Sequence, residues 1–315
     1  MGSWKAYAAG VSWSSIFGLS FLVTKGALEA FSPVTLLFLR FALATAALGL
    51  LALAGIVKLG YRGKPMLPLV LICLFQPILY FTFETFGLRE VASSTAGLII
   101  GALPAAVAAL SAPLLREHLA KRQVAGLLLS IAGVALVVMA GDSGSGSGAN
   151  KAVAAAGGAA PDSLRGILLV VGAMVSAAFY NVYSRKASVR YSPAETTFAM
   201  MISGAVFFGL LVMLEAARNG WSGLFSRATP AAWGAVAYLG ILSSVVAFFL
   251  VNLSLARLKA AQASIFGTLT TLVSLVAGVL LRAEPFGLVQ VLGASGIVLG
   301  VWMTNAGGRQ GQQAS

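Results

Sequence analysis

The composition of this chain excludes a water-soluble globular protein. Of its 315 residues, 59% are hydrophobic and only 10% are charged, whereas soluble domains carry roughly 25% charged residues. So few polar side chains could not cover a surface that faces water. The net charge of +12 does not indicate a nucleic-acid-binding protein. The Lys and Arg residues stand in short clusters between apolar runs, as they do in the loops of membrane proteins.

Ten apolar stretches follow one another along the chain, and charged residues, proline and glycine separate them. Each stretch is long enough to cross a bilayer as a helix of about 20 residues. We predict transmembrane helices at residues 6–24, 33–57, 66–87, 93–115, 122–141, 164–184, 193–217, 230–254, 261–281 and 287–306. The first stretch continues as a full span without a signal-peptide cleavage site. The fold class is therefore all-α integral membrane.

A stretch rich in glycine, alanine and serine separates the fifth span from the sixth. It is typical of a flexible linker. The alternative is a glycine-rich phosphate-binding loop, but the stretch follows no predicted strand and no Lys-Ser or Lys-Thr pair follows it. The chain then divides into a first five-helix repeat at 1–141, the linker at 142–163, a second five-helix repeat at 164–306 and a disordered C-terminal tail at 307–315.

The distribution of Lys and Arg predicts that both termini are cytoplasmic, because these residues accumulate in cytoplasmic loops. The side that holds the termini has thirteen of the 21 Lys and Arg residues: Lys5, Lys58, Arg62, Lys64, Arg116, Lys121, Arg122, Arg185, Lys186, Arg190, Arg257, Lys259 and Arg309. The opposite side has seven: Lys25, Arg89, Lys151, Arg165, Arg218, Arg227 and Arg282. Arg40 lies within a span.

The two halves of the chain repeat each other. Ser32-Pro33 and Ser192-Pro193 match at an offset of 160 residues. Further along, one offset of 167 residues relates Glu117, Gln123, Gly126 and Gly133 to Glu284, Gln290, Gly293 and Gly300. Because each half has an odd number of spans, the second half crosses the membrane in the opposite orientation. Inverted repeats of this kind place a solute site near the midplane between the halves and permit alternating access.

With these features the sequence resembles the EamA-like branch of the drug/metabolite transporter superfamily over nearly its whole length. The residues that carry the resemblance are Phe17-Gly18, Lys25, Ser32-Pro33, Arg40, the segment 87–100, Leu103-Pro104, Glu117, Gln123, Gly126, Gly133, the segment 258–264, Glu284-Pro285, Gln290, Gly293 and Gly300. One departure is Thr271, which stands where the first half has Pro104, so a bend of the ninth span is not assured.

The resemblance implies ten helices in a 5+5 inverted-topology repeat around a central cavity, in the bacterial cytoplasmic (inner) membrane. Within the branch, the chain is similar to the YddG-type amino-acid exporters. This similarity implies a secondary transporter that exports neutral or aromatic amino acids and related metabolites by alternating access. An exporter of other small metabolites or drugs, and a passive channel or facilitator, are the alternatives.

Polar side chains within the spans are the candidates for the solute site, because a polar group in hydrocarbon is costly unless it is partnered or faces a wet cavity. Gln76, Tyr80 and Glu84 recur every four residues and share one helix face, and Pro77 can kink that helix. The candidate cavity residues are Trp13, Ser14, Phe17, Gln76, Tyr80, Glu84, Thr95, Tyr180, Asn181, Ser244, Asn252, Thr268 and Thr271. They place the site between spans one, three, four, six, eight and nine. The Ser and Thr residues have the alternative of bonding to their own helix.

Arg40 and Glu84 are the only full charges well inside the predicted spans. Both lie in the outer third of their spans, so we predict that they are near each other and offset one another's charge. One interpretation is a structural pair that locks two neighbouring helices. The other is functional, with Arg40 as an anchor for a substrate carboxylate or Glu84 as a proton carrier.

The remaining polar residues limit the chemistry further. The span interiors contain no lysine, which disfavours phosphorylated sugars, and a single acid, which argues against a strongly cation-selective multidrug pump. An aromatic and amide-rich cavity suits a neutral or zwitterionic solute with an apolar side chain. One histidine (His118), one cysteine (Cys73) and one deep acid do not supply a catalytic constellation or a metal site, so neither an enzyme nor a cofactor is expected.

The expected partners are a small-molecule substrate and the lipid bilayer, without nucleic acid. The last predicted span carries a GxxxG motif at Gly296 and Gly300, which allows close helix contact. Packing against the fifth span is one use of this motif, and a homodimer is the other. We expect a monomer.

Overall fold

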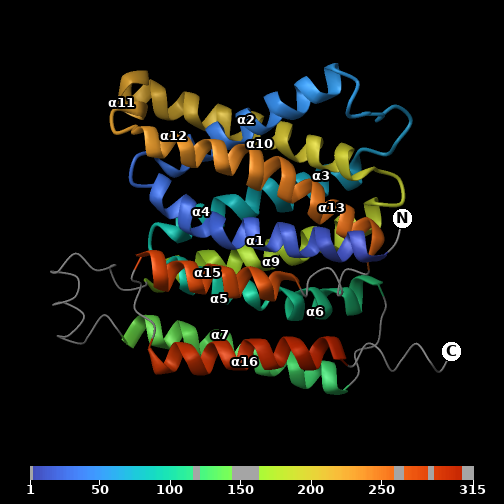
Figure 1. Cartoon of the computed structure of the whole chain (residues 1–315), viewed down its shortest axis with the longest axis vertical. Helices are drawn as coiled ribbons and strands as arrows, with labels where there is room; N and C mark the ends of the chain where they lie inside the picture. Colours follow the sequence, from blue (N-terminus) through green and yellow to red (C-terminus); the bar gives the residue numbers. More distant parts are fainter. Residues whose placement is uncertain (1–2, 116–120, 144–162, 259–265, 283–286, 307–315) are drawn as a thin grey trace.

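The computed structural model describes residues 3–115, 121–143, 163–258, 266–282 and 287–306. Within these ranges helices dominate, and in Figure 1 they cross the view as long rods stacked along the long axis of the molecule. Residues 144–162 of the predicted linker and the predicted tail at 307–315 lie outside the described residues, as do His118, Glu117 and Glu284.

A helix, or a series of consecutive helical segments, occupies each of the ten predicted ranges as far as the structure describes it. The first half has α1 (Ser3–Ala27), α2 (Pro33–Leu53), α3 (Leu67–Cys73), the π-helical segment η1 (Leu74–Leu79), α4 (Tyr80–Leu88), α5 (Ser93–Gly101), α6 (Leu103–Leu115) and α7 (Lys121–Ser143). The second half has α9 (Leu164–Ala187), α10 (Pro193–Asn219), α11 (Trp221–Phe225), α12 (Pro230–Ala237), the π-helical segment η2 (Tyr238–Ala247), α13 (Phe248–Arg257), α15 (Phe266–Arg282) and α16 (Leu288–Ala306). The short helix α11 was not predicted.

The helix starts follow from local side-chain chemistry. Ser32 and Ser192 are the N-caps of α2 and α10, each with proline at the first helical position. Their hydroxyls accept the backbone N–H three residues later, which satisfies a donor that the helix itself leaves unpaired. At α10 the side chain of Glu195 also accepts the backbone N–H of Ser192, which completes a capping box. The Ser-Pro pair that marks the repeat in the sequence is therefore a helix start in both halves.

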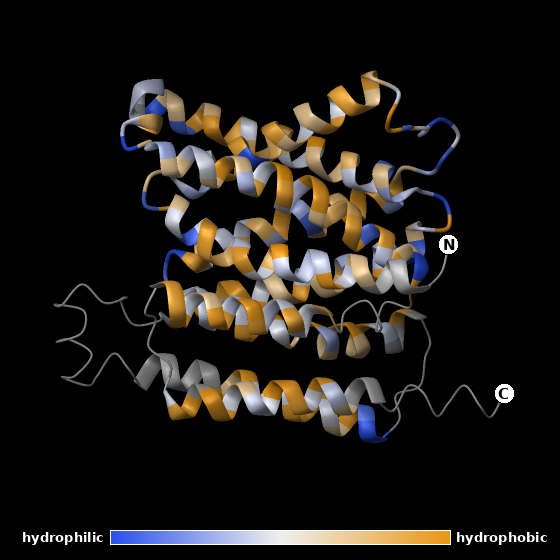
Figure 2. Ribbon diagram, in the orientation of Figure 1, coloured by the Kyte–Doolittle hydropathy of each residue, from blue (hydrophilic) through white to orange (hydrophobic). Residues whose placement is uncertain are grey.

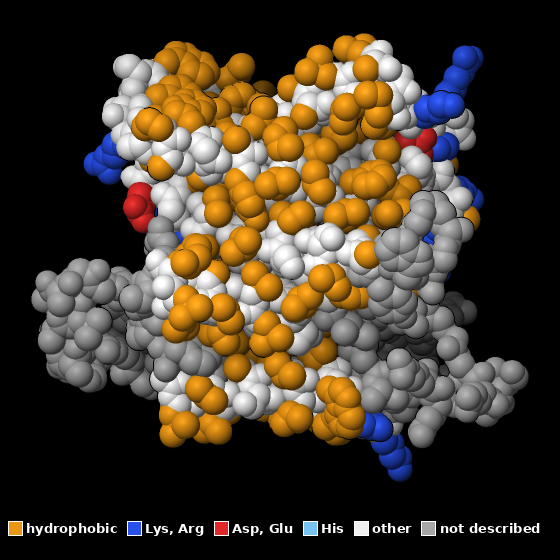
Figure 3. Space-filling model, viewed as in Figure 1, with side chains coloured by type: hydrophobic (Ala, Val, Ile, Leu, Met, Phe, Trp, Pro, Cys, Tyr) orange, Lys and Arg blue, Asp and Glu red, His pale blue; other side chains and the backbone are white. Residues whose placement is uncertain are grey.

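Six helices of the described chain are long and apolar enough to cross a membrane: Pro33–Leu53, Leu67–Leu88, Ser93–Ser111, Leu164–Ala187, Pro193–Arg218 and Pro230–Arg257. Two shorter apolar helices cover Phe266–Leu281 and Val291–Met303. Hydrophobic residues recur along the long helices (Figure 2), and leucines such as Leu53 and Leu280 are 87% and 74% exposed. In Figure 3 hydrophobic side chains cover the middle of the visible face, while Lys and Arg stand at its left and right margins. This is the surface of a multi-pass membrane protein.

The helices α2 and α10 pack against each other and run antiparallel, with contacts at both ends. At one end, the hydroxyl of Ser32 at the start of α2 donates to Glu215 near the end of α10, at 2.8 Å. At the other end, Lys64 beyond the end of α2 forms an ion pair of 2.7 Å with Glu195 at the start of α10. The backbone N–H of Gly60 donates to the same carboxylate at 2.9 Å.

The helices α7 and α16 form a second antiparallel pair. Gly133 on α7 lies against Gly293 and Ile297 of α16, and Gly300 lies against Gly126 and Ser130. Glycines at the crossing let the two backbones approach closely. The predicted packing of the GxxxG motif against the fifth span is therefore confirmed.

We predict that Gly133→Ala destabilises the protein. A Cβ atom at this position would lie 2.7 Å from the carbonyl oxygen of Gly293 and from the backbone nitrogen of Ile297, so α16 has to move away from α7. Overpacking of this kind costs about 1–3 kcal/mol, and the thermal unfolding midpoint in detergent should fall. The matched control is Gly49→Ala in α2, where a Cβ meets no atom within 4 Å. Equal midpoints for the two variants would contradict the close packing.

Candidate functional site

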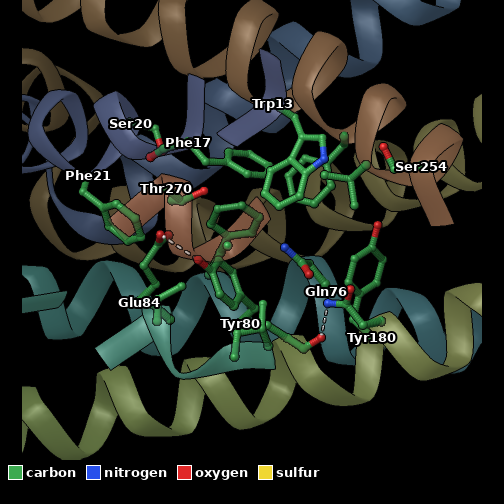
Figure 4. A pocket seen from close by; sticks show the side chains of 18 residues that line it. Trp13, Phe17, Ser20, Phe21, Gln76, Tyr80, Glu84, Tyr180, Ser254 and Thr270 are labelled. Atoms are coloured by element: carbon green, nitrogen blue, oxygen red, sulfur yellow. Dashed lines mark hydrogen bonds between the residues drawn. The ribbon is translucent and has the colours of Figure 1, made fainter. Parts of the chain in front are cut away.

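A narrow internal cavity lies between helices of both halves (Figure 4). Its volume is about 60 Å³. The lining residues are Trp13, Phe17, Ser20 and Phe21 of α1, Gln76 of η1, Tyr80, Phe81 and Glu84 of α4, Ile100 of α5, Leu103 of α6, Ala177, Tyr180 and Asn181 of α9, Phe248, Val251 and Ser254 of α13, and Gly267 and Thr270 of α15. These elements belong to spans one, three, four, six, eight and nine, the six spans between which the sequence predicts the site.

An interruption of the third span turns Gln76 toward this cavity. The backbone at Gln76 has φ −152° and ψ 117°, which is extended, and a cis peptide bond joins it to Pro77. The predicted kink beside Gln76 is therefore confirmed. The side chain of Gln76 is buried and lines the cavity, but its amide makes no hydrogen bond to another described residue. An amide without a protein partner is available to a solute.

The carboxylate of Glu84 is the only charged group in the described lining. The hydroxyl of Tyr80 donates to Glu84 Oε1 at 3.1 Å, as the dashed line in Figure 4 marks. The second oxygen, Oε2, is buried and has no hydrogen-bond partner, and the same holds for the indole Nε1 of Trp13. A free acceptor and a free donor thus belong to residues that line one cavity.

Aromatic rings form most of the remaining wall. Phe17 and Phe248 meet edge to face with their centroids 5.1 Å apart. Trp13 contacts Phe17 at 5.8 Å, and Phe81 contacts Phe248 at 5.8 Å. Such rings offer large apolar contact surfaces and electron-rich faces. The cavity is therefore suited to a solute with an apolar body and few polar groups.

The structure places Arg40 outside the cavity. Its Nε and Nη2 atoms donate to the hydroxyls of Ser244 and Ser243 at 3.0 and 2.9 Å, and its guanidinium lies 4.2 Å from the ring centroid of Phe81. Glu84 interacts with it electrostatically, as predicted, but no ion pair within 4.0 Å joins these two residues. Arg40 thus joins α2 to η2 of the eighth span by hydrogen bonds and to α4 of the third span by its contact with Phe81.

Asn252 also lies outside the lining, in a fully bonded cluster. Its side-chain oxygen accepts hydrogen bonds from the hydroxyls of Tyr180 at 3.0 Å and Ser184 at 2.9 Å. Its side-chain nitrogen donates to Thr197 Oγ1 at 3.0 Å. The cluster ties α9, α10 and α13 together, so this amide has a structural role in the observed arrangement.

Seven of the predicted cavity residues line the cavity: Trp13, Phe17, Gln76, Tyr80, Glu84, Tyr180 and Asn181. Six do not: Ser14, Thr95, Ser244, Asn252, Thr268 and Thr271. The hydroxyl of Ser14 bonds to the carbonyl of Gly10 on its own helix. Thr271 donates to the carbonyl of Gly97 at 2.9 Å and joins α15 to α5. Thr95 is buried on α5, and the buried hydroxyl of Thr268 on α15 has no hydrogen-bond partner.

Several lining residues were not among the predicted ones. Phe21 follows Trp13 and Phe17 at a spacing of four residues, and the sequence places it on the same helix face, although it is not among the candidate cavity residues. Ser20, Ser254 and Thr270 are polar residues within spans. Other serines and threonines stand nearby in the same spans, and the sequence does not distinguish the ones that line the cavity. Leu103 and Ala177 carry no signal, because apolar residues fill every span.

The sequence profile of the EamA-like transporter family matches residues 4–139 and 164–306, which is most of the chain. The chain belongs to the EamA-like transporter family. The family is one of membrane transporters, and the resemblance noted in the sequence is confirmed.

Several relatives of this family member cover nearly its full length. It is 34% identical to the uncharacterized transporter YcxC of Bacillus subtilis (strain 168) over 95% of the chain and 92% of that protein. It is 29% identical to a probable terminal-alkyne amino-acid exporter of Streptantibioticus cattleyicolor over 96% of the chain and 92% of that protein. A solved crystal structure with 22% sequence identity shares the fold, with a TM-score of 0.65 over 98% of this chain and 99% of that one.

We predict that Asn252→Leu destabilises this transporter. The change removes three interhelical hydrogen bonds and leaves the hydroxyls of Tyr180, Ser184 and Thr197 without this partner. Interhelical bonds in membranes average about 0.6 kcal/mol each, so we expect a loss of about 2 kcal/mol, measured as a lower unfolding midpoint in detergent. Asn181→Leu is the comparison, because Asn181 bonds only to the carbonyl of Ala177 on its own helix. A similar loss for both variants would argue against the interhelical role.

Proposed function

We propose that the protein is a secondary transporter that exports neutral or aromatic amino acids and related small metabolites by alternating access. The observation that carries this proposal is the cavity between helices of both halves, with its aromatic wall, its unpaired amide and its single carboxylate. A pocket of this kind, mostly apolar with a few convergent polar groups, is typical of small-molecule sites.

The contacts between helices support a 5+5 inverted repeat of ten spans. Three contacts across the halves have counterparts with the halves exchanged: α1 with α15 and α9 with α5, α4 with α9 and α13 with α1, and α2 with η2 and α10 with η1. The pairs α2 with α10 and α7 with α16 are their own counterparts and run antiparallel. The two segments that match the family profile also agree with repeats at 1–141 and 164–306.

The small size of the cavity supports a transporter that changes conformation when its solute binds. At about 60 Å³ it is smaller than the roughly 300–1,000 Å³ of typical ligand pockets. A solute as large as an amino acid enters only when side chains or helices move apart. In an inverted repeat, the two halves exchange conformations to open the site to each side in turn.

The amino-acid substrate is supported by the lining and by one relative. The lining residues supply apolar surface and hydrogen-bonding groups but no lysine or arginine, so multiply charged anions are disfavoured. The probable terminal-alkyne amino-acid exporter is similar to this chain over nearly its whole length. We propose an amino-acid substrate here by analogy with that relative.

We expect saturable counterflow in vesicles reconstituted with the purified protein. Vesicles loaded with unlabelled phenylalanine should accumulate labelled phenylalanine transiently, because a carrier exchanges solute through one site.

Trp13→Phe removes the unpaired indole N–H and should lower the transport efficiency at least threefold. The control is Trp302→Phe, a change on the outer face of α16 where Trp302 is 61% exposed. Flux that rises in proportion to concentration, without counterflow, would instead support a channel. Strong uptake of sugar phosphates without amino acids would overturn the substrate class.

The orientation with both termini in the cytoplasm is tested by cysteine labelling. In Figure 1, α1 begins and α16 ends on the same side, at the right of the view. In a Cys73→Ser background, we expect a membrane-impermeant maleimide to label Ser226→Cys, between α11 and α12, in intact cells. Val189→Cys, between α9 and α10, should react only after the membrane is permeabilised. The reverse pattern would place the termini outside.

A further inference from the structure

Glu84 occupies a distinct end of the cavity, which the residues around it define. In Figure 4, Ser20, Phe21 and Thr270 lie at the same end as Glu84, whereas Gln76 and the indole nitrogen of Trp13 lie toward the other side of the view. Along the chain, eight residues separate Gln76 from Glu84, which corresponds to about 12 Å of helix. Aromatic rings, among them that of Tyr80, lie between these two polar ends.

The polar groups at the Glu84 end offer acceptors and few donors. Glu84 Oε2 is buried without a partner, and the side chain of Glu84 is 4% exposed. Ser20 gives its hydroxyl proton to the carbonyl of Phe17 at 2.8 Å, and Thr270 gives its own to the carbonyl of Phe266 at 3.4 Å. The hydroxyl of Tyr80 donates to Glu84. The free lone pairs at this end therefore suit an ammonium group, which has three N–H donors and no acceptor.

A carboxylate finds no counterpart at the same end. The described lining contains no lysine or arginine. Arg40 interacts electrostatically with Glu84, but it lies outside the cavity, bonds to Ser243 and Ser244 and stacks on Phe81. In an α-amino acid, the ammonium nitrogen and the carboxyl carbon are bonded to the same atom through bonds of about 1.5 Å. An α-amino acid that places its ammonium at Glu84 therefore also places its carboxylate beside Glu84, where like charges repel.

From this geometry we propose that Glu84, with Ser20 and Thr270, is a binding site for a protonated amine, and that the cavity prefers primary amines with an apolar body over the corresponding α-amino acids. The inference rests on the proposed transport function and, among its substrates, ranks related metabolites with a primary amine above the α-amino acids themselves. The aromatic rings hold the body of the solute. If the solute carries a second polar group at the end opposite its amine, this group lies in the part of the cavity that Gln76 and Trp13 line.

Three compounds with a common phenyl body test the proposal. 2-Phenylethylamine carries only the amine, phenylalanine carries both groups, and 3-phenylpropionate carries only the carboxylate. We expect radiolabelled 2-phenylethylamine to bind the full-length protein in nanodiscs. Unlabelled phenylalanine should compete at least tenfold more weakly than unlabelled 2-phenylethylamine, and 3-phenylpropionate should not compete. The proposal is overturned if phenylalanine binds as tightly as the amine, if 3-phenylpropionate competes, or if the amine does not bind.

Two Glu→Gln variants, which change the charge by the same amount, test where the amine binds. Glu84→Gln should weaken binding of 2-phenylethylamine at least tenfold, because it removes the charge and keeps the shape. Glu90→Gln should leave binding within twofold, because Glu90 lies outside the cavity and bonds to Arg165 and Ser163. Unchanged binding in Glu84→Gln would overturn the proposal. Size-exclusion chromatography and thermal unfolding check that both variants are folded.

A further variant covers the case in which Glu84→Gln does not fold. Ser20→Val removes one acceptor at the same end and should weaken amine binding about threefold, and unchanged binding would overturn the proposed site. The binding assay also separates this inference from the transport function. If the amine binds in a Glu84-dependent way but no counterflow occurs, the transport function is rejected and the amine site is kept. If phenylalanine shows counterflow but the protein does not prefer the amine, the transport function is kept and the amine site is rejected.

Discussion

Polar side chains inside the apolar body of this protein have no bulk water to bond to, so a partner within the protein or a place at the cavity stabilises them. Arg40 meets this constraint with two serines of η2 and the ring of Phe81. Asn252 meets it with hydroxyls of α9 and α10. Glu84 Oε2 and the Trp13 indole have no such partner. Arg40 and Asn252 thus belong to the framework of the protein, whereas the unpaired groups of Glu84 and Trp13 belong to its candidate site.

The framework includes two antiparallel helix pairs, each with one helix from either half of the chain. At α7 and α16, glycines bring the backbones together, and at α2 and α10, Glu215 and the ion pair of Lys64 with Glu195 join opposite ends. Between these pairs lie the helices that line the cavity (Figure 1). Two of the lining spans contain π-helical segments, η1 and η2. Wider turns and breaks of this kind are frequent at functional sites, which agrees with a solute site at the centre.

The accuracy of the site prediction differed between residue types, for a physical reason. Gln76, Tyr80 and Glu84 form a regular stripe, so the helical period alone placed them on one face. Serine and threonine are different, because they satisfy their hydroxyls within one helix at little cost. Ser14 was predicted and Ser20 was not, yet both bond to their own helix and Ser20 lines the cavity. Which of them faces the cavity depends on how α1 is rotated against its neighbours.

The sequence by itself determined that the chain is helical and lies in a membrane and where α2 and α10 begin, and it predicts that the two halves are related. These properties depend on local chemistry: runs of apolar residues, Ser-Pro caps and glycines at a constant offset. Only the tertiary structure decided that Arg40 bonds to the eighth span, that Asn252 and Thr271 join helices, and that Glu84 keeps an unpaired oxygen beside the cavity. These properties depend on which helix faces meet, and residues far apart in the chain must come together before a polar group has a partner or lacks one.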